Sequence, residues 1–130
     1  MATLATAFLA TSALAQDAGD PAEGEKVFRQ CKTCHAVTDA DGNDVVKGGK
    51  VGPNLYGVVG RTAGTWDDFR YSDSMIAAGE AGLEWNAEDF TVYVQDPTAF
   101  LRDYLDDKSA RGKMTFKLRD PADAAHLWAY

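Results

Sequence analysis

The sequence predicts an all-α fold in which short helices are joined by long, glycine-rich loops. Residues 20–23 (Asp-Pro-Ala-Glu) and 120–123 (Asp-Pro-Ala-Asp) each combine a capping Asp, a Pro in the first helical turn and an acid three residues after the cap. Six glycines fall within residues 48–64, which is typical of loop backbone that can lie against a flat ligand. A chain of 130 residues, 45% of them hydrophobic, is expected to form a single domain.

The predicted helices follow one another along the chain. After the Asp20 cap, Val27 and Phe28 should point inward, and in the last helix Leu127 and Tyr130 should share one face. We expect the first and last helices to pack together and close the fold. Three further helices are predicted: over 72–78 with Gly79 as its stop, from the cap Asn86 to Asp96, and over 98–105.

The two ends of the chain carry signals of their own. The first fifteen residues contain no charged side chain and end in Ala13-Leu14-Ala15, a small-x-small cleavage pattern. We therefore predict a signal peptide over 1–15, too short to span a bilayer, and a mature domain over 16–130. Because the last helix stops at Tyr130 after few turns, we expect the C-terminal helix to be truncated in this chain.

The pentapeptide Cys31-Lys32-Thr33-Cys34-His35 is the strongest chemical signal in the sequence. Cys-x-x-Cys-His is the attachment sequence of a c-type haem. Two thiols at this spacing near the end of a helix can add to the two vinyl groups on one edge of the porphyrin, and the imidazole that follows then faces the iron. We predict one covalent haem c, attached through Cys31 and Cys34, with His35 as the proximal iron ligand.

Three other interpretations of the cysteine pair compete with haem attachment. Cys31 and Cys34 could form a thioredoxin-like dithiol or a short disulfide. A dithiol site of that kind belongs to a βαβ unit, and no segment here resembles a parallel strand. A zinc site would need four ligands, whereas the chain offers two Cys and two His, His35 and His126. Haem attachment is therefore favoured.

The segment between His35 and Pro53 is predicted to be a polar loop. Residues 39–44 (Asp-Ala-Asp-Gly-Asn-Asp) resemble part of a calcium loop. The glycine is misplaced, however, and the twelfth position is Lys50, where a glutamate is needed. We interpret this stretch as a surface turn.

The formal charge of −7 argues against binding to nucleic acid or to an anionic membrane. The charge is unevenly distributed, because residues 61–90 hold seven acids against two arginines. By contrast, residues 45–61 hold Lys47, Lys50 and Arg61 without an acid, and residues 108–119 hold five basic residues without an acid. These basic segments are either solvated faces or a docking surface.

Beyond the pentapeptide, several stretches occur in the order seen in class I cytochromes c, a family that the chain resembles over residues 20–130. Within that family it is most similar to the cytochromes c2 of purple photosynthetic bacteria. The resemblance implies the cytochrome c fold, with helices and glycine-rich loops wrapped around one covalently bound haem. The matching stretches are residues 52–57 (Gly-Pro-Asn-Leu-Tyr-Gly), Gly60-Arg61, Trp85, Tyr93 with Asp96-Pro97, and residues 113–116 (Lys-Met-Thr-Phe).

The mature chain offers Met75, Met114 and His126 as candidates for the second axial ligand. Met75 lies in a predicted amphipathic helix, where a methionine is ordinarily part of the core. His126 lies in the last helix, which should be packed against the first. Met114 follows Gly112 in a loop that can bring the thioether to the haem face. The resemblance selects the same residue, so we expect His35 and Met114 to ligate the iron.

The resemblance also implies roles for residues around the haem. The Pro53 carbonyl should accept a hydrogen bond from His35, and the Tyr93 hydroxyl should lie near the Met114 sulfur. Without the family, Trp85 and Tyr93 would be interpreted as plain core aromatics. The residues that correspond to those around the haem propionates are Tyr56, Arg61, Tyr71 and Trp85.

With both axial positions filled, the implied function is that of a soluble periplasmic one-electron carrier, not an enzyme. The expected route runs from a quinol-oxidising cytochrome bc complex to a photosynthetic reaction centre or a terminal oxidase. We expect a monomer that docks on these membrane complexes through Lys47, Lys50, Lys113 and Lys117. The alternatives are a catalytic or gas-binding haem protein with a labile or absent sixth ligand, and a haem-free thiol oxidoreductase.

Overall fold

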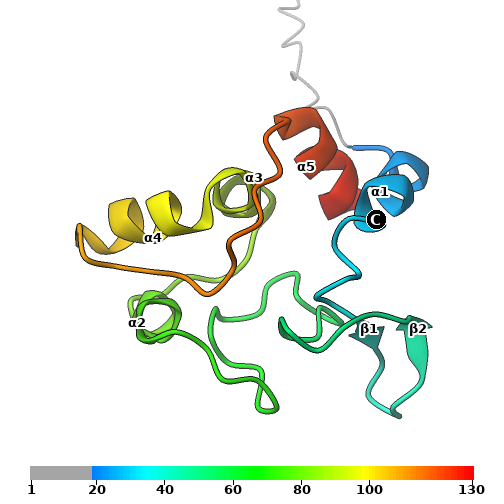
Figure 1. The fold of residues 1–130 in the computed structure, drawn as a ribbon, viewed down its shortest axis with the longest axis horizontal. Helices are drawn as coiled ribbons and strands as arrows, with labels where there is room; N and C mark the ends of the chain where they lie inside the picture. The colour runs from blue at the N-terminus through cyan, green and yellow to red at the C-terminus, as the bar shows by residue number, and fades with distance from the viewer. Residues whose placement is uncertain (1–18) are drawn as a thin grey trace, which may run out of the picture.

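The computed structural model of the chain describes residues 19–130. The predicted signal peptide over 1–15 lies outside the described residues. The described part forms five helices and one small antiparallel sheet (Figure 1). In chain order the elements are α1 (Pro21–Phe28), β1 (Val37–Thr38), β2 (Asp44–Val46), α2 (Asp73–Glu80), α3 (Ala87–Gln95), α4 (Pro97–Leu105) and α5 (Pro121–Ala129).

Side-chain caps fix where the helices begin, and the predicted caps Asp20, Asn86 and Asp120 are confirmed. At the start of α1, a carboxylate oxygen of Asp20 accepts a hydrogen bond from the Ala22 amide at 2.8 Å. Because the first amides of a helix have no partner within it, each such cap removes an unsatisfied donor. The equivalent caps are Ser72 for α2, Asn86 for α3, Asp96 for α4 and Asp120 for α5.

Helices α1 and α5 pack together, which confirms the predicted closure of the fold (Figure 1). The rings of Phe28 and Tyr130 lie 5.7 Å apart between centroids. The backbone amide of Asp20 donates to Nδ1 of His126 at 2.8 Å. This hydrogen bond ties the beginning of α1 to the last turn of α5.

The centre of the core is aromatic and lies where α3 and α4 meet. Trp85 and Tyr93 lie 4.8 Å apart between ring centroids, and Tyr93 meets Phe100 edge to face at 5.7 Å. All three rings are buried, next to the fully buried Leu101 and Leu83. Edge-to-face and tilted arrangements of this kind are the favourable ones for aromatic pairs.

Helix α2 differs from its predicted extent. Gly79 was expected to stop it, whereas the helix continues through Gly79 to Glu80. A Cβ atom at position 79 would lie 1.9 Å from the carbonyl oxygen of Ala63. Gly79 therefore allows a loop to approach the helix closely, and the prediction that it ends the helix was wrong.

The polar loop after His35 contains a short hairpin that the sequence did not predict. Val37 pairs with Val46, and Thr38 pairs with Asp44, across an antiparallel ladder with an irregular register. The predicted surface turn forms its tip, where Asp39 accepts the amides of Asp41 and Asn43, both at 2.9 Å.

The segment between α4 and α5 is extended and runs past α4 and α3 before it reaches α5 (Figure 1). Its end is fixed by the amide of Leu118, which donates to the Val94 carbonyl at 2.7 Å. No helix within residues 19–130 is both long and apolar enough to cross a bilayer.

Candidate functional site

The Cys-x-x-Cys-His segment continues directly from the end of α1 as a series of tight turns. The amide of Cys31 donates to the Phe28 carbonyl at 2.8 Å, and the amides of Cys34 and His35 donate to the Cys31 carbonyl at 3.1 and 2.9 Å. These bonds hold the pentapeptide in a helix-like conformation, so the two thiols and the imidazole keep a fixed spacing.

Both cysteines are free thiols and are partly exposed. Burial, and to a smaller extent the neighbouring Cys34, raises the pKa of Cys31 to about 11. A reactive dithiol needs a lowered thiol pKa, so this environment does not favour the thiol-oxidoreductase interpretation. No group of three or more His, Cys, Asp or Glu side chains in residues 19–130 is placed to hold a metal ion.

The imidazole of His35 has one defined orientation. Its Nδ1 lies 2.8 Å from the carbonyl oxygen of Pro53, and because that oxygen can only accept, Nδ1 carries the hydrogen. Burial lowers the pKa of His35, although the bond to Pro53 acts in the opposite direction. A neutral ring protonated at Nδ1 keeps its lone pair on Nε2, the form that a metal ligand requires.

The loop that supplies Pro53 is held against the haem-attachment segment. The Gly52 amide donates to the Cys34 carbonyl at 2.8 Å. A Cβ atom at position 52 would lie 2.4 Å from Cε1 of His35, so only glycine lets the backbone pass this close to the ring.

Asn54 is a positioning residue that the sequence analysis did not single out. Its side chain accepts from the Thr38 amide at 3.0 Å and donates to the Thr38 carbonyl at 2.8 Å. The same oxygen accepts from the Tyr56 amide at 3.0 Å. Asn54 therefore joins the hairpin to the Pro53 loop. The signals for it in the sequence were its position directly after the proline and its place in the matching stretch 52–57.

Arg61 lies half-buried, and it has no carboxylate partner among residues 19–130. Its guanidinium donates to the carbonyls of Asn54 at 3.0 Å and Tyr56 at 3.2 Å, and lies 5.1 Å from the centroid of the Trp66 ring. Neither ion pair within residues 19–130 involves Arg61. Burial lowers the pKa of Arg61, so an anionic group nearby would offset the cost of this charge.

The structure brings Tyr71 and Trp85 close to Arg61. Backbone bonds join Arg61 to Trp85, whose amide donates to the Arg61 carbonyl at 3.0 Å. The hydroxyl of Tyr71 accepts from the Trp66 amide at 3.3 Å, and burial raises the pKa of Tyr71. Tyr56, by contrast, is exposed at the neighbouring turn.

Tyr93 is the most buried of the predicted site tyrosines. Burial, with a smaller effect from Tyr71, strongly raises the pKa of its phenol. The ring packs between Trp85 and Phe100. Tyr93 and Trp85 are thus core aromatics as well as candidates for contact with a cofactor.

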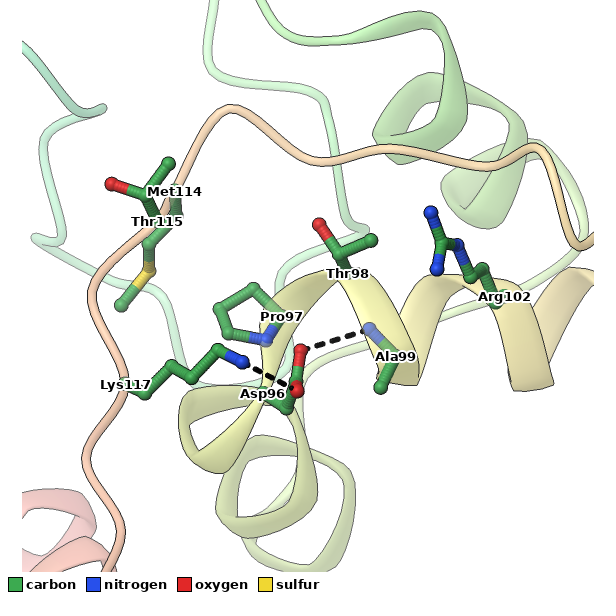
Figure 2. Close-up of a pocket in the computed structure, with 8 residues that line it drawn as sticks. All are labelled: Asp96, Pro97, Thr98, Ala99, Arg102, Met114, Thr115 and Lys117. Atoms are coloured by element: carbon green, nitrogen blue, oxygen red, sulfur yellow. Dashed lines mark hydrogen bonds and ion pairs between the residues drawn. The ribbon is translucent and has the colours of Figure 1, made fainter.

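Met114 is half-buried and lies on the extended segment between α4 and α5, opposite the beginning of α4 (Figure 2). Several anchors fix this segment on both sides of the methionine. The Arg111 amide donates to Oγ of Ser74 in α2 at 3.0 Å, and Nζ of Lys113 donates to the Arg70 carbonyl. On the other side, Lys117 forms an ion pair with Asp96 at 2.8 Å.

The two competing candidates for the axial position have other contacts. Met75 is 7% exposed and belongs to the hydrophobic core. Nδ1 of His126 accepts the hydrogen bond from the Asp20 amide that joins α1 to α5. Of the three candidates, Met114 is the one on a loop.

The residues present fit a covalently attached haem. Two free thiols follow a helix, a neutral imidazole presents Nε2, and a half-buried arginine has no anionic partner in the described part of the chain. A fold of short helices and long loops with this donor set defines the class of c-type haem proteins.

Comparison with known proteins identifies the family. The family model described as cytochrome c matches residues 21–130. Cytochrome c2 of Cereibacter sphaeroides is 56% identical over 126 residues, which cover 95% of this chain and 86% of that protein. Cytochrome c-550 of Paracoccus denitrificans is 49% identical over 131 residues, covering 98% and 84%. The crystal structure of cytochrome c2 from Rhodobacter sphaeroides matches with a TM-score of 0.85 and 55% identity, and covers 86% of this chain and 93% of that one.

The chain belongs to the cytochrome c family. The predicted cytochrome c fold and the similarity to bacterial cytochromes c2 are confirmed. The protein is an electron carrier with one covalently bound haem c, for which Cys31 and Cys34 supply the attachment motif, and it is not an enzyme.

Proposed function

We propose that this protein is a periplasmic one-electron carrier whose haem iron is ligated by His35 and Met114. It accepts electrons from a quinol-oxidising cytochrome bc complex and delivers them to a photosynthetic reaction centre or a terminal oxidase. The observation that carries the proposal is the 2.8 Å bond between Nδ1 of His35 and the Pro53 carbonyl. This bond keeps the Nε2 lone pair available to bind iron in the histidine that directly follows the cysteine pair.

The loop that carries Met114 supports the proposal, because contacts on both sides of the methionine hold it in place. Anchors to α2 on one side and to Asp96 on the other hold the loop without occupying the thioether. A thioether opposite an imidazole favours the ferrous state and raises the potential. When bound, the haem supplies the Fe(II)/Fe(III) couple.

The surrounding residues have the chemistry that the haem propionates require. We propose that Arg61 offsets their negative charge from its half-buried position. Tyr93 lies in the buried aromatic cluster, and Met114 packs against the core that contains it. We propose that the Tyr93 hydroxyl lies near the Met114 sulfur. The other donors that we propose are Tyr56, Tyr71 and Trp85. Hydrogen bonds to backbone carbonyls join Tyr56 and Trp85 to Arg61, and the Tyr71 hydroxyl accepts from the Trp66 amide.

We propose that the protein docks on acidic surfaces of its partners through Lys47, Lys50, Lys113 and Lys117, all of which are exposed. The four lysines do not contribute equally to the electrostatic attraction. Lys117 is already paired with Asp96, and Lys113 is bound to the Arg70 carbonyl and lies 5.7 Å from the Phe69 ring centroid. Pairing with Asp96 offsets the charge of Lys117, whereas Lys113 keeps its full charge beside a neutral carbonyl. Lys47, Lys50 and Lys113 therefore contribute most of the steering charge.

We also propose that the protein is exported to the periplasm and acts there as a single copy. Attachment of a c-type haem in bacteria takes place outside the cytoplasmic membrane, which is consistent with cleavage after Ala15 and a single domain over residues 16–130. We propose that this domain acts as a monomer, because a carrier that binds two partners in turn needs small, transient contacts, of roughly 1,200 Å² or less.

A two-partner kinetic assay tests the proposed function. The purified haem-loaded protein is mixed with a reduced bc complex, and its reduction is followed by haem absorbance. The reduced protein is then mixed with an illuminated reaction centre or an oxidase. Fast one-electron reduction and re-oxidation, with no oxygen consumption by the protein alone, is the expected result. Prompt binding of carbon monoxide by the reduced protein at neutral pH would instead favour a gas-binding or catalytic haem protein.

A further inference from the structure

A groove between α3 and α4 has an apolar floor and an acidic rim. The helical spacing produces it, because Glu88 and Val92 lie four residues apart on α3, and Phe100 and Tyr104 lie four residues apart on α4. Residues that the proposed electron-transfer site does not use line the groove: Glu88, Asp89, Val92, Phe100, Asp103 and Tyr104.

The floor presents a flat aromatic face to solvent. The ring of Tyr104 stacks on the buried ring of Phe100, with centroids 5.7 Å apart and planes inclined by 20°. Tyr104 is 37% exposed, and the adjacent Val92 is 52% exposed. Leaving this apolar area in water is unfavourable, so a side chain that covered it would gain free energy.

The rim is negative and lacks a cation. Glu88 and Asp103 are exposed, and neither ion pair within residues 19–130 involves them or Asp89. Asp89 accepts a hydrogen bond from the side chain of Asn86 at 2.7 Å. The groove therefore combines an exposed aromatic face with two carboxylates that have no positive partner in the described part of the chain.

We propose that this groove binds a segment of a partner protein that presents an arginine or lysine beside an apolar side chain. The cation stacks on the Tyr104 ring and pairs with Glu88 or Asp103, while the apolar neighbour covers Val92. A second copy that offered the same face would bring like charges together, and an anionic membrane would meet the same repulsion. A basic protein segment is thus the occupant that the charge selects.

The groove is separate from Lys47 and Lys50, two of the lysines proposed for docking on redox partners. In Figure 1, α4 lies on the left of the molecule and β2, which precedes Lys47 and Lys50, lies on the right. A basic segment can therefore occupy the groove while Lys47 and Lys50 face an acidic surface. The proposal does not depend on the electron-transfer route and can fail without affecting it.

The test is a titration of the reduced, haem-loaded, ¹⁵N-labelled protein with the peptide acetyl-Arg-Leu-Arg-Leu-Arg-amide, followed by amide chemical shifts. We expect saturable shifts centred on residues 88–92 and 100–104 that weaken as salt is added. The peptide acetyl-Gln-Leu-Gln-Leu-Gln-amide should cause no comparable shifts. The double variant Glu88→Gln, Asp103→Asn should bind the arginine peptide about 3–30-fold more weakly.

A matched variant distinguishes specific binding in the groove from non-specific attraction of the basic peptide to a negatively charged protein. Asp67→Asn with Asp68→Asn makes the same change in charge on exposed residues outside the groove and should leave the affinity unchanged. Equal weakening by the two double variants, or equal binding of the glutamine peptide, would overturn the proposal. Shifts at 88–104 that depend on protein concentration without peptide would overturn it in favour of a second copy. Tyr104→Ala should also weaken binding while the haem spectrum stays native.

Discussion

The carbonyl oxygen of Pro53 lies 2.8 Å from Nδ1 of His35, although the two residues are separated by a hairpin and a run of glycines. The hydrogen bond fixes both the tautomer and the direction of the imidazole. It also makes Nε2 more basic toward a metal, because the Nδ1 hydrogen is drawn toward the acceptor. The orientation of the His35 ring in the attachment pentapeptide therefore depends on the loop that carries Pro53.

Gly52→Ala should disturb this arrangement directly. The new Cβ would lie 2.4 Å from Cε1 of His35, so either the ring or the loop must move. We expect a loss of roughly 1–3 kcal/mol in the free energy of unfolding, together with a changed haem spectrum. Gly42→Ala is the control, because its φ of +85° also disfavours a side chain but nothing lies within 4 Å. It should cost about 1 kcal/mol and leave the spectrum native. A native spectrum in both variants would contradict the account of Gly52.

Arg61→Leu should lower the midpoint potential. We propose that Arg61 lies beside the haem propionates. Removing its half-buried positive charge from there favours the ferric state, and at a separation of ~10 Å this amounts to roughly tens of millivolts. Arg119→Leu makes the same charge change at an exposed position and should have little effect on potential. The measurement is a spectroelectrochemical titration of both variants. Lower stability without any change in potential for Arg61→Leu would show that the residue only supports the loop.

Asp96 should contribute a pH-dependent part of the stability. The hydrogen bond from Lys117, with that from the Ala99 amide, holds the pKa of Asp96 below its usual range. A lowered pKa in the folded state stabilises the fold above the unfolded-state pKa, and this contribution is lost as the pH falls through the folded-state value. Asp96→Asn keeps a capping side chain but loses the charge. It should lower the Tm by a few degrees at neutral pH.

The difference in Tm between the wild type and Asp96→Asn should shrink as the pH falls below about 4. Thermal unfolding at a series of pH values measures it. Asp67→Asn, at an exposed position, is the control and should show no such dependence. A Tm difference that stays constant down to acid pH would rule out the ion pair as its source.

Local signals predicted the elements that depend on neighbouring residues, and long-range contacts decided the rest. The capping residues Asp20, Asn86 and Asp120 could be identified because a cap acts within one helical turn. The hairpin could not, because its strands are too short for an alternating pattern and depend on Asn54, sixteen positions from Thr38. Gly79 looked like a helix stop because its contact with Ala63 is not local.

In the candidate site too, a local motif predicted some residues, whereas others depend on contacts between distant segments. The pentapeptide motif alone predicted the roles of Cys31, Cys34 and His35. The assignments of Arg61 and Trp85 required the family resemblance, since their proximity comes from backbone bonds between distant segments. The sequence also could not show that the lysines contribute unequally to docking, because the ion-pair partner of Lys117 is Asp96, far from it along the chain.

Association with an acidic redox partner should slow as salt is added, despite the net charge of −7. Charges within the ~8–10 Å Debye length of ordinary buffers act at the contact, whereas the acidic surface farther away is screened. Lys47→Glu and Lys50→Glu should each reduce the second-order rate several-fold at low ionic strength and flatten its salt dependence. The measurement is the bimolecular electron-transfer rate at several ionic strengths.

Lys26→Glu is the matched control for these charge reversals, because Lys26 is already paired with Glu23 on α1. Glu88→Lys should likewise change the rate little, since it lies on the face with the α3–α4 groove. A wild-type rate that rises with salt, or an equal loss from Lys26→Glu, would show that Lys47 and Lys50 do not steer docking.

The most direct test of the central claim, ligation of a covalently held haem by His35 and Met114, is the ferric absorption spectrum of the wild type, Met114→Ala and Met75→Leu. The wild type should show the weak red band of methionine bound to ferric iron. Met114→Ala should lose the band and bind carbon monoxide when reduced. Met75→Leu, a core substitution, should keep the band. Loss of the band in Met75→Leu together with its retention in Met114→Ala would contradict the assignment.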